Sequence, residues 1–507
     1  MVVQRQEEMK ATPSRASGIL LHPTSLPGFG GIGTIGRNAC DFVKILERSG
    51  TRLWQMLPLG PTGYGDSPYA ALSAFAGNPL LIDLELLVDQ ELLRRSDLAL
   101  PPMNPQAVDF GTVIPVKTQL LRKAFETFRI SGSQTIGREL ESFVRDNAFW
   151  LDDFTLFVAL KDEHHGAPWT DWESELRRRD AKALSRARER LQRDIELQQF
   201  VQFLFFRQWQ GLKRHANEHG ISIVGDMPIF VAHDSADVWA RQDLFELDDR
   251  GQTTVVAGVP PDYFSRTGQR WGNPHYRWSA MQADGYAWWL QRMRMMIETV
   301  DIIRLDHFRG FAAAWAIPGT DATAERGEWR PAPGMELFST FSSSLGDLPL
   351  IAEDLGVITP DVLELRDRFH LPGMKILQFA FGSDAFNENL PHNLERPVVV
   401  YTGTHDNDTT LGWFSSIGLP ERTRVCRYTH TDGREIGWDL IRLGIASVAD
   451  MAFAPLQDVL GLGSSARMNL PGRADGNWTW RFTWDALTDT FVERLLELNR
   501  TFGRTTK

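Results

Sequence analysis

The sequence predicts an α/β fold, a (β/α)8 barrel, and three observations support this prediction. Eight short apolar or β-branched runs recur along the 507 residues, and such near-continuous runs are typical of parallel strands covered on both faces. Helix-length segments separate most of the runs, which favours alternating strands and helices. Acidic residues stand at the ends of several runs, where the strands of a barrel open onto its mouth.

The strand and helix candidates follow one another in the order that a barrel requires. The predicted strands lie within 17–23, 52–58, 221–230, 300–308, 348–356, 373–382, 397–406 and 451–461. The clearest predicted helices lie within 36–50, 285–300 and 359–370. The last of these helices opens with Thr359-Pro360, an N-cap residue followed by proline at the first helical position.

Two intervals between predicted strands are too long for simple crossovers. Residues 62–200 begin with a Gly/Pro-rich loop and continue as mostly helical sequence, whereas residues 230–285 are rich in loops. Long loops in a compact domain are usually functional, so we expect both segments to be insertions near the barrel mouth. Residues 16–507 are then a single barrel domain, and residues 1–15 are expected to be a flexible terminus.

The charge balance excludes a nucleic-acid groove as the main purpose of the protein. Lys and Arg number 54 and Asp and Glu number 65, which gives a net charge of −11. The densest basic stretch, 177–193, carries interleaved Asp and Glu at helical spacing, so it is interpreted as a solvated helix face. The sequence therefore predicts no nucleic-acid partner.

Cysteine usage and hydropathy bear on the cellular location. The two cysteines, Cys40 and Cys426, are far apart in the sequence and form no disulfide framework, which fits a reducing cytoplasm. The first 17 residues lack the apolar core of a signal peptide,. No apolar run approaches the length of about 18 residues needed to span a membrane. We therefore expect a cytoplasmic protein with no membrane partner.

Three acidic residues carry most of the chemical information. Asp306 in IIRLDHF, Glu353 in LIAEDLG and Asp406 in VVVYTGTHD each end an apolar run. A carboxylate at a strand exit is costly to desolvate, so it needs partners or a chemical role. Each interval between them is long enough for a helix and a return to the next strand. Three neighbouring parallel strands would then aim three carboxylates at one mouth, as cleavage of a glycosidic bond requires.

Asp306 is the candidate nucleophile. Side chains alternate along a strand, so Arg304 and Asp306 share a face. The guanidinium would hold the carboxylate ionised, which suits nucleophilic attack. The alternative is a buried Arg–Asp pair that only ends the strand, and the presence of the other two acids argues against it.

Glu353 is the candidate general acid, a role that needs a raised pKa. Ile351 and Leu355 would flank it on the same strand face and provide apolar walls. The adjacent Asp354 would point to the opposite side, so only one of the two reaches the mouth. Glu353 is preferred, partly for its longer reach. The alternative is that the acid here only caps a helix and that Glu353 lies in the wall of the sheet without a catalytic role.

The other polar candidates are more ambiguous. Asp406 could hydrogen-bond sugar hydroxyls or stabilise charge on a sugar ring, whereas a metal site formed by His405, Asp406 and Asp408 would be a weak ligand set. Asp226, in IVGDMPIF, is a fourth acid at a strand exit, although a turn-forming role suits it almost as well. No metal is predicted.

Aromatic residues in polar loops suggest a sugar cradle. The chain has 17 Trp, most of which belong to the core. Tyr64, Tyr69 and Trp271 lie in Gly-rich polar segments instead, and an aromatic plate beside amide donors suits a sugar ring, which has an apolar face and a polar rim. Gln269 and Asn469 would supply the amides. A packing role is equally compatible with each of these residues alone.

Several of these segments together resemble the amylomaltase, or disproportionating-enzyme, family of 4-α-glucanotransferases. The resemblance runs from about residue 15 to the end of the chain. It rests on RASGILLHPTSLPGFGGIGTIG, WQMLPLGPTGYGDSPYAALSAFAGNP, GDMPIFV, GVPPDYFSRTGQRWGNPHY, IIRLDHFRGF, IAEDLG, YTGTHDNDT and the late NLPG.

The resemblance implies a (β/α)8 barrel without the separate C-terminal β-domain of α-amylases. It also implies transfer of α-1,4-glucan segments between maltooligosaccharides, with no metal or organic cofactor. Carried over by motif, Asp306 matches the nucleophile, Glu353 the acid/base and Asp406 the third acid, which supports the distorted sugar ring. Residues matching sugar contacts at the cleavage subsite are Arg304, His405 and Asp226, and those matching the glucan groove are Tyr69, Gln269, Trp271 and Asn469.

The expected reaction is a retaining double displacement through a covalent glucosyl-aspartate. The alternatives are an α-amylase-type glucan hydrolase and a non-catalytic glucan-binding protein, although the latter would be expected to have lost one of the three acids. The resemblance assigns no acceptor contact within 382–396 or 417–435. Phe379 is the only acceptor-site candidate, and a core role suits it equally.

Overall fold

The computed structural model describes residues 15–261, 265–473 and 475–505. Apart from Arg15, whose guanidinium donates to Ser447 O at 3.0 Å, the predicted flexible terminus lies outside these residues.

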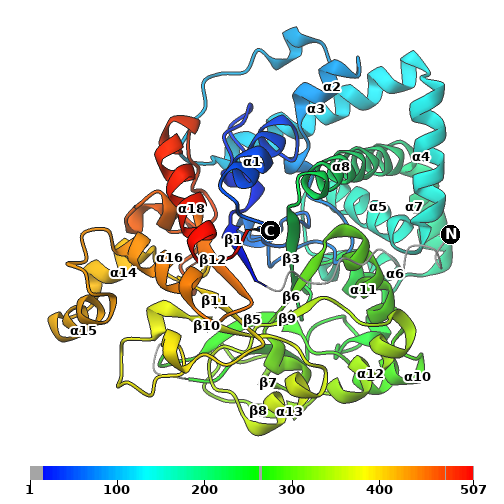
Figure 1. The fold of residues 1–507 in the computed structure, drawn as a ribbon. Coiled ribbons are helices and arrows are strands. Elements are labelled where there is room, and N and C mark those ends of the chain that lie inside the picture. Colours follow the sequence, from blue (N-terminus) through cyan, green and yellow to red (C-terminus); the bar gives the residue numbers. More distant parts are fainter. Residues whose placement is uncertain (1–14, 262–264, 474, 506–507) are drawn as a thin grey trace.

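Eight parallel strands form a nearly closed barrel (Figure 1), as the sequence predicted. Each predicted run coincides with one of them, although β1 begins one residue before its run: β1 Ala16–Leu20, β2 Leu53–Gln55, β3 Ser222–Pro228, β6 Ile302–Asp306, β9 Leu350–Ala352, β10 Gly373–Ile376, β11 Val398–Tyr401 and β12 Met451–Pro455. Parallel ladders connect them in the order β10-β11-β12-β1-β2-β3-β6-β9. Between the two end strands, Ala352 N donates to Pro372 O at 2.9 Å.

Alternation along the strands separates the barrel interior from its outer face. A buried cluster fills the interior and includes Val224, Ile302, Ile351, Tyr401 and Phe453. A much larger cluster packs the strands against the surrounding helices. Asp226, Arg304 and Glu353 each lie two positions after a residue of this cluster, so they face the interior near the C-terminal ends of the strands. The candidate site lies there.

Helices cover the barrel from outside. The three predicted helices form as α1 Arg37–Arg48, α11 Ala287–Thr299 and α13 Pro360–Arg368. Thr359 occupies the N-cap position of α13, but its side chain accepts no capping hydrogen bond. The remaining helices outside 62–200 are α9 Ala236–Ala240, α10 Trp278–Ala283, α12 Gly334–Leu345, α14 Thr410–Ser416, α15 Leu419–Thr429, α16 Ile436–Ala446, α17 Leu456–Val459 and α18 Asp489–Thr501.

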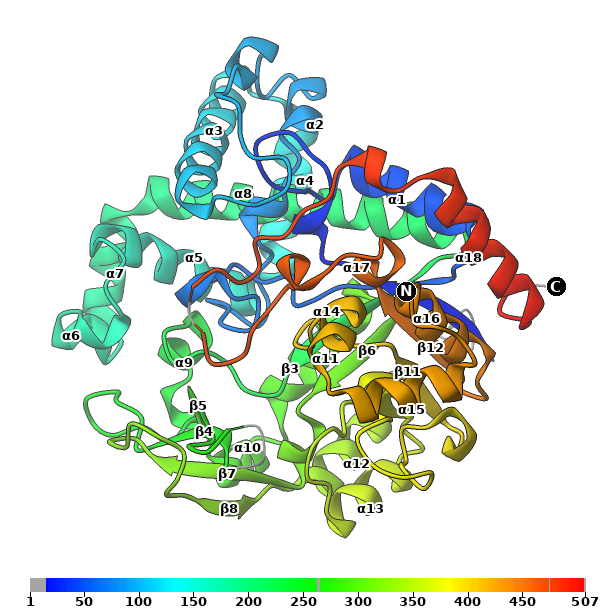
Figure 2. The same cartoon turned by 90° about the vertical axis from the view of Figure 1, so that its left-hand side faces the viewer.

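The two ends of the described chain meet on one side of the barrel. Figure 2 shows α18 alongside α1, and Arg48 Nη2 on α1 lies 2.5 Å from Asp489 Oδ1 at the start of α18. In the described residues no strand follows β12, so a separate C-terminal β-domain is absent from this part of the chain.

The long interval between β2 and β3 is helical. Most of these helices lie together on one side of the barrel (Figure 2). They are α2 Leu84–Asp89, α3 Phe110–Ser131, α4 Gln134–Asp146, α5 Ala148–Glu163, α6 Ser174–Arg177, α7 Ala181–Arg190 and α8 Gln192–Glu218. The basic stretch 177–193 lies mainly on α7, where Arg190 pairs with Glu163 and Arg186 with Glu175.

A second sheet, which the sequence analysis did not predict, lies outside the barrel (Figure 2). Its antiparallel strands are β4 Val255–Val259, β5 Gln269–Pro274, β7 Ala313–Pro318 and β8 Glu328–Pro331, in the order β5-β4-β7-β8. Strand β5 reads QRWGNP, with neither an apolar run nor strict alternation, so the usual strand signal is absent there.

Among the described residues, no helix combines the length and the apolar character needed to cross a membrane.

Candidate active site

The candidate carboxylates gather where the strands end at one mouth of the barrel. Strand β3 carries Asp226, which is paired in register with Arg304 on β6. On the other side of β6, Leu305 is in register with Ala352 of β9, so Asp306 and Glu353 are the next residues of their two strands. Neighbouring parallel strands thus present these acids at the same level of the barrel.

Arg304 joins two of the acids. Its Nη1 donates to Asp226 Oδ1 and Oδ2 at 2.8 and 2.7 Å and to Asp306 Oδ1 at 2.9 Å. Arg304 and Asp226 are only 4% and 3% exposed, so their charges compensate each other in a poorly hydrated place. Burial acts to lower the pKa of Arg304, but the two carboxylates outweigh it and raise that pKa. The guanidinium therefore stays charged and places a fixed positive charge beside Asp306.

Tyr69 reaches the site from the segment that follows β2. Its hydroxyl donates to Asp226 Oδ2 at 2.7 Å, and its ring stacks on His405, with centroids 5.1 Å apart and planes inclined by 16°. Burial, followed by the nearby charge of Asp226, raises the pKa of Tyr69. Tyr69 is therefore a hydrogen-bond donor that connects Asp226 to His405.

Glu353 is held by backbone donors. Its Oε2 accepts from His307 N at 2.7 Å and its Oε1 from Leu355 N at 3.1 Å. Burial raises its pKa from 4.5 to about 8; Arg304 opposes this shift and the charge of Asp306 adds to it. At neutral pH the group is largely protonated, which is the state a general acid needs.

Asp354 faces the other way. Its Oδ1 accepts from Met374 N and its Oδ2 from Arg366 Nη1 on α13, both at 2.7 Å. The two adjacent acids therefore point to opposite sides: Glu353, the preferred candidate, binds the backbone next to Asp306, whereas Asp354 ties the end of β9 to β10 and to the helix layer.

His307 belongs to the site, although the sequence analysis did not single it out. It adopts a left-handed conformation with φ of 49°, which is uncommon for a residue other than glycine. Its imidazole meets the ring of Trp271 edge to face at 4.8 Å, and burial lowers its pKa to about 4. The imidazole is therefore neutral at physiological pH.

Asp406 lies in the segment after β11. Asn469 Nδ2 donates to Asp406 Oδ1 at 2.6 Å, and His405 Nε2 lies 3.4 Å from the same oxygen. The backbone of this segment is held as well, because Arg467 Nη2 donates to Asp406 O at 2.5 Å and Asn469 N to His405 O at 3.1 Å. The segment around residue 469 thus orients the third acid.

Two of the four groove candidates, Tyr69 and Asn469, contact carboxylates directly, whereas the other two lie on the second sheet. Gln269 and Trp271 are on β5 of the second sheet, where Trp271 Nε1 donates to Gln269 Oε1 at 3.1 Å. Trp271 is linked to the acids through His307. Tyr64 is strongly exposed, and among the described residues no contact connects it to the four acids.

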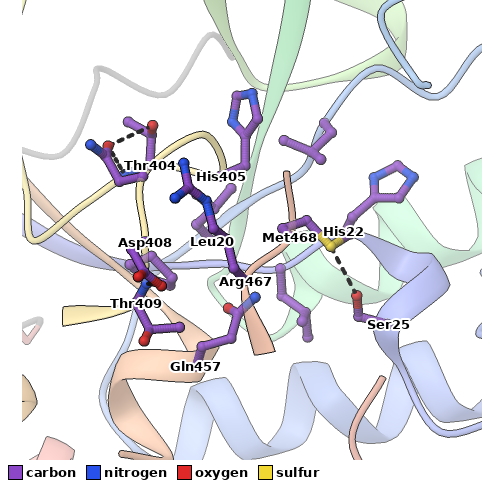
Figure 3. A pocket seen from close by; sticks show the side chains of 14 residues that line it. Leu20, His22, Ser25, Thr404, His405, Asp408, Thr409, Gln457, Arg467 and Met468 are labelled. Carbon is purple, nitrogen blue, oxygen red and sulfur yellow. Dashed lines mark hydrogen bonds between the residues drawn. The ribbon is translucent and has the colours of Figure 1, made fainter. Parts of the chain in front are cut away.

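A small pocket adjoins the site between the ends of β11, β12, β1 and β2 (Figure 3). His22 and His405 lie toward one end of it, and Asp408, Thr409 and Gln457 toward the other. Burial, then the proximity of His405, lowers the pKa of His22 to about 3, so its imidazole is neutral. Neither His22 nor Arg467 was predicted from the sequence, because each lies in an apolar or mixed run without an acidic neighbour.

The described residues contain no group of three or more His, Cys, Asp or Glu side chains that could hold a metal ion. Asp408, part of the weak ligand set considered above, accepts from Ser464 Oγ at 2.7 Å and from Thr409 N at 2.8 Å. These bonds direct its carboxylate to neighbouring backbone and hydroxyl groups instead.

Parallel barrel strands that deliver several carboxylates and a buried arginine to one mouth define a class of enzyme, the barrel enzymes that act on glycosidic bonds. Comparison with known proteins identifies the family within this class. A model of the family described as 4-alpha-glucanotransferase matches residues 21–488. The chain belongs to the 4-α-glucanotransferase, or amylomaltase, family and is an enzyme of this kind.

Relatives match nearly the whole chain. The 4-alpha-glucanotransferase of Thermus thermophilus is 51% identical over 490 residues, which cover 95% of this chain and 97% of the relative. That of Synechocystis is 50% identical over 496 residues, which cover 97% and 98%. Among solved structures, an amylomaltase from Streptococcus agalactiae in complex with acarbose superposes with a TM-score of 0.94 at 38% identity, covering 97% of this chain and all of that one.

Proposed function

We propose that the enzyme transfers α-1,4-glucan segments between maltooligosaccharides by a retaining double displacement. The observation that carries this proposal is the arrangement at the ends of β6 and β9. Arg304 donates a hydrogen bond to Asp306, and the backbone N–H of the following residue, His307, donates one to Glu353. A charged guanidinium thus lies beside Asp306, and its neighbour Glu353, with a raised pKa, is suited to donate a proton. The complex of the Streptococcus agalactiae amylomaltase with acarbose supports an α-glucan as the substrate.

In the first half-reaction, Glu353 protonates the bridging oxygen while Asp306 attacks the anomeric carbon from the opposite face. The bond between that carbon and the bridging oxygen breaks, and a covalent glucosyl-aspartate forms. The leaving glucan departs carrying the proton of Glu353. Retention of this kind requires the two carboxyl groups to lie about 5–5.5 Å apart, whereas inverting enzymes separate them by about 6.5 Å or more.

In the second half-reaction, the Glu353 carboxylate acts as a base. It takes the proton from the 4-hydroxyl of an incoming glucan, whose oxygen displaces Asp306 from the anomeric carbon. Two inversions restore the α configuration. Glu353 is protonated again, so the cycle closes without a cofactor.

The surrounding residues have distinct proposed roles. Asp406, positioned by Asn469, binds hydroxyls of the distorted sugar and stabilises positive charge that develops on its ring. Arg304, Asp226 and His405 contact the sugar at the cleavage subsite, and Tyr69 orients Asp226 and His405. Gln269 and Trp271 line the glucan groove on the side of the second sheet.

Transfer and hydrolysis start from the same covalent intermediate and differ in whether a sugar or water reaches it. We propose that residues 62–200 and 230–285 are insertions into a single barrel domain, 16–507, that exclude water and hold the acceptor. The alternative is an α-amylase-type hydrolase. Family membership supports transfer, because three carboxylates alone serve both reactions.

Incubation with maltotriose separates the two reactions. We expect a ladder of longer and shorter maltooligosaccharides with little net release of reducing ends, whereas glucose and maltose alone would indicate a hydrolase. Asp306→Asn should lower turnover by about 10⁴-fold or more with an unchanged melting temperature. Mass spectrometry of Glu353→Gln after reaction with a maltosyl fluoride should find the glycosyl group on Asp306; a label elsewhere would overturn the assignment.

The cytoplasm is the proposed location. Cys40 and Cys426 are both unpaired in the structure, which agrees with a reducing compartment.

A further inference from the structure

Phe386 is the most exposed large apolar side chain among the described residues, at 89%. It lies in the segment 382–396 between β10 and β11, to which the family resemblance assigned no contact. Single exposed apolar residues are common on protein surfaces, so exposure alone carries no function. The way in which the backbone around Phe386 is fixed distinguishes it from an ordinary surface residue.

The residues on both sides of Phe386 are firmly held. Phe386 N donates to Asp384 Oδ1 at 2.9 Å, and Ala385 O is contacted by His392 Nε2 at 2.9 Å and by Asn393 Nδ2 at 2.8 Å. A loop that only connects two strands does not need this number of side-chain contacts. The backbone that displays the aromatic ring is therefore preorganised, so ordering this loop adds little to the entropic cost of binding a ligand.

The same loop is hydrogen-bonded to the segment that directly follows β10 and to a neighbouring helix. Asn387 Nδ2 donates to Phe379 O at 2.9 Å and to Ser383 Oγ at 3.0 Å. On the other side, His392 Nδ1 lies 2.9 Å from the hydroxyl of Tyr428 on α15. The ring of Phe386 is left in solvent while its backbone is fixed from two directions.

The position of the loop connects it to the catalytic end of the barrel. Phe379 closes the short 3-10 helix Leu377–Phe379 that directly follows β10, so the segment leaves the barrel at its C-terminal mouth. Gln378 Nε2 donates to Asp408 O at 2.9 Å, which joins this segment to the one that carries Asp406. Figure 1 shows the segment, in yellow, running outward from the strands toward α15.

A ligand of suitable chemistry follows from the proposed function, on which this inference rests. An α-glucan is a polymer, so units beyond the cleaved bond extend past the mouth. The C–H face of a glucose unit packs against an aromatic ring, and such contacts do not need buried polar groups. We propose that Phe386 is an outer glucan-binding residue, which stacks on a glucose unit of a long chain lying over the rim formed by residues 382–396.

The test compares Phe386→Ala and Phe386→Trp with the wild-type enzyme on maltotriose, maltopentaose, maltoheptaose and amylose. Phe386→Ala should raise KM by about 2–10-fold for the long substrates and progressively less for shorter ones, with kcat changed little. Phe386→Trp keeps an aromatic face and should retain the wild-type KM. Val448→Ala is the control, because Val448 is an apolar residue that is 47% exposed but lies just before β12, at the end of the barrel opposite the mouth, and it should change no parameter.

An unchanged KM for maltoheptaose and amylose in Phe386→Ala would overturn the proposal, as would an equal rise for all chain lengths. A dimer that dissociates on Phe386→Ala without a change in KM, measured by light scattering, would identify a second copy as the partner and would also overturn it. Calorimetric binding of maltoheptaose to both proteins gives a readout that does not depend on turnover. Weaker binding of maltoheptaose by Phe386→Ala supports the glucan contact whether or not transfer is observed. If the wild-type enzyme forms no ladder from maltotriose, that result rejects the proposed function but leaves this contact standing.

Discussion

The backbone N–H of His307 donates to Glu353 Oε2 at 2.7 Å, although the two residues come from different strands. The left-handed φ of His307 turns the chain out of the strand directly after this N–H, and the following Phe308 N donates to Glu353 O at 3.0 Å. Glu353 N in turn donates to Leu305 O at 3.0 Å, so the bonds run in both directions. Since Asp306 precedes His307, this exchange fixes the proposed nucleophile relative to the proposed proton donor before substrate arrives, and such preorganisation reduces the cost of reaching the transition state.

The raised pKa of Glu353 predicts a loss of activity at alkaline pH. Forming the covalent intermediate requires the protonated acid, and its protonated fraction falls as the pH rises through about 8. In the wild-type enzyme, kcat/KM for maltotriose should be insensitive to this group below that pH and should decline about tenfold per unit well above it. A stopped assay across pH 5–10 with a stability control measures the profile, and a decline centred near pH 5 would contradict the prediction.

The neighbouring acids Glu353 and Asp354 should separate chemistry from stability. Glu353→Gln removes the proton donor, so kcat for maltotriose should fall by about 10³-fold or more while the fold persists. Asp354→Asn weakens the contacts with Met374 N and Arg366 and should lower the free energy of unfolding by about 1–3 kcal/mol. Its kcat at 25 °C should stay within a few-fold of the wild type. Urea titrations and maltotriose assays on both variants check the contrast, and inactivation by Asp354→Asn without unfolding would reverse the assignment.

Local pattern predicted the parts of this site that lie on strands. Apolar runs located all eight barrel strands, and the two-residue period placed Arg304 beside Asp306 and separated Glu353 from Asp354. These relations depend on the geometry of a single strand, which the sequence encodes directly.

Relations between distant segments could not be obtained in this way. The bond from Tyr69 to Asp226 crosses 157 residues and that from Asn469 to Asp406 crosses 63; local pattern singled out these four residues but did not pair them. The φ of His307 could not be predicted from the sequence, because a positive φ is uncommon outside glycine even for histidine, which adopts it more often than most residues. The second sheet was missed because its edge strand QRWGNP gains its order from pairing with β4 and not from a pattern of its own.

Tyr69→Phe should separate the hydroxyl of this residue from its ring. The variant keeps the stack on His405 but removes the donor to Asp226, which leaves a buried carboxylate oxygen with one contact fewer. A hydrogen bond to a charged group is worth about 1.5–3 kcal/mol, so kcat/KM should fall by roughly 10–100-fold. Tyr69→Ala also removes the stack and should lose more. Equal losses in the two variants would show that only the hydroxyl matters, and full activity of Tyr69→Phe would remove Tyr69 from the network.

Asp458 should position the segment that carries His405 and Asp406. Its carboxylate is 1% exposed and accepts from Thr402 Oγ1, Thr410 Oγ1 and Thr410 N at 2.6, 2.6 and 2.7 Å, so it fastens both ends of that segment.

Asp458→Asn replaces an acceptor with a donor that faces two hydroxyls. We expect unfolding to require about 1–3 kcal/mol less and kcat to fall severalfold with a smaller change in KM, because a displaced Asp406 supports the transition state less well than the bound substrate. Asp439→Asn is the matched control, since Asp439 accepts from Thr431 Oγ1 at 2.8 Å at the surface, far from any acid of the site in sequence. If Asp458 has a purely structural role, Asp458→Asn should lose stability but keep the wild-type kcat at temperatures where the variant is folded. That result would show that the segment carrying His405 and Asp406 keeps its geometry without Asp458.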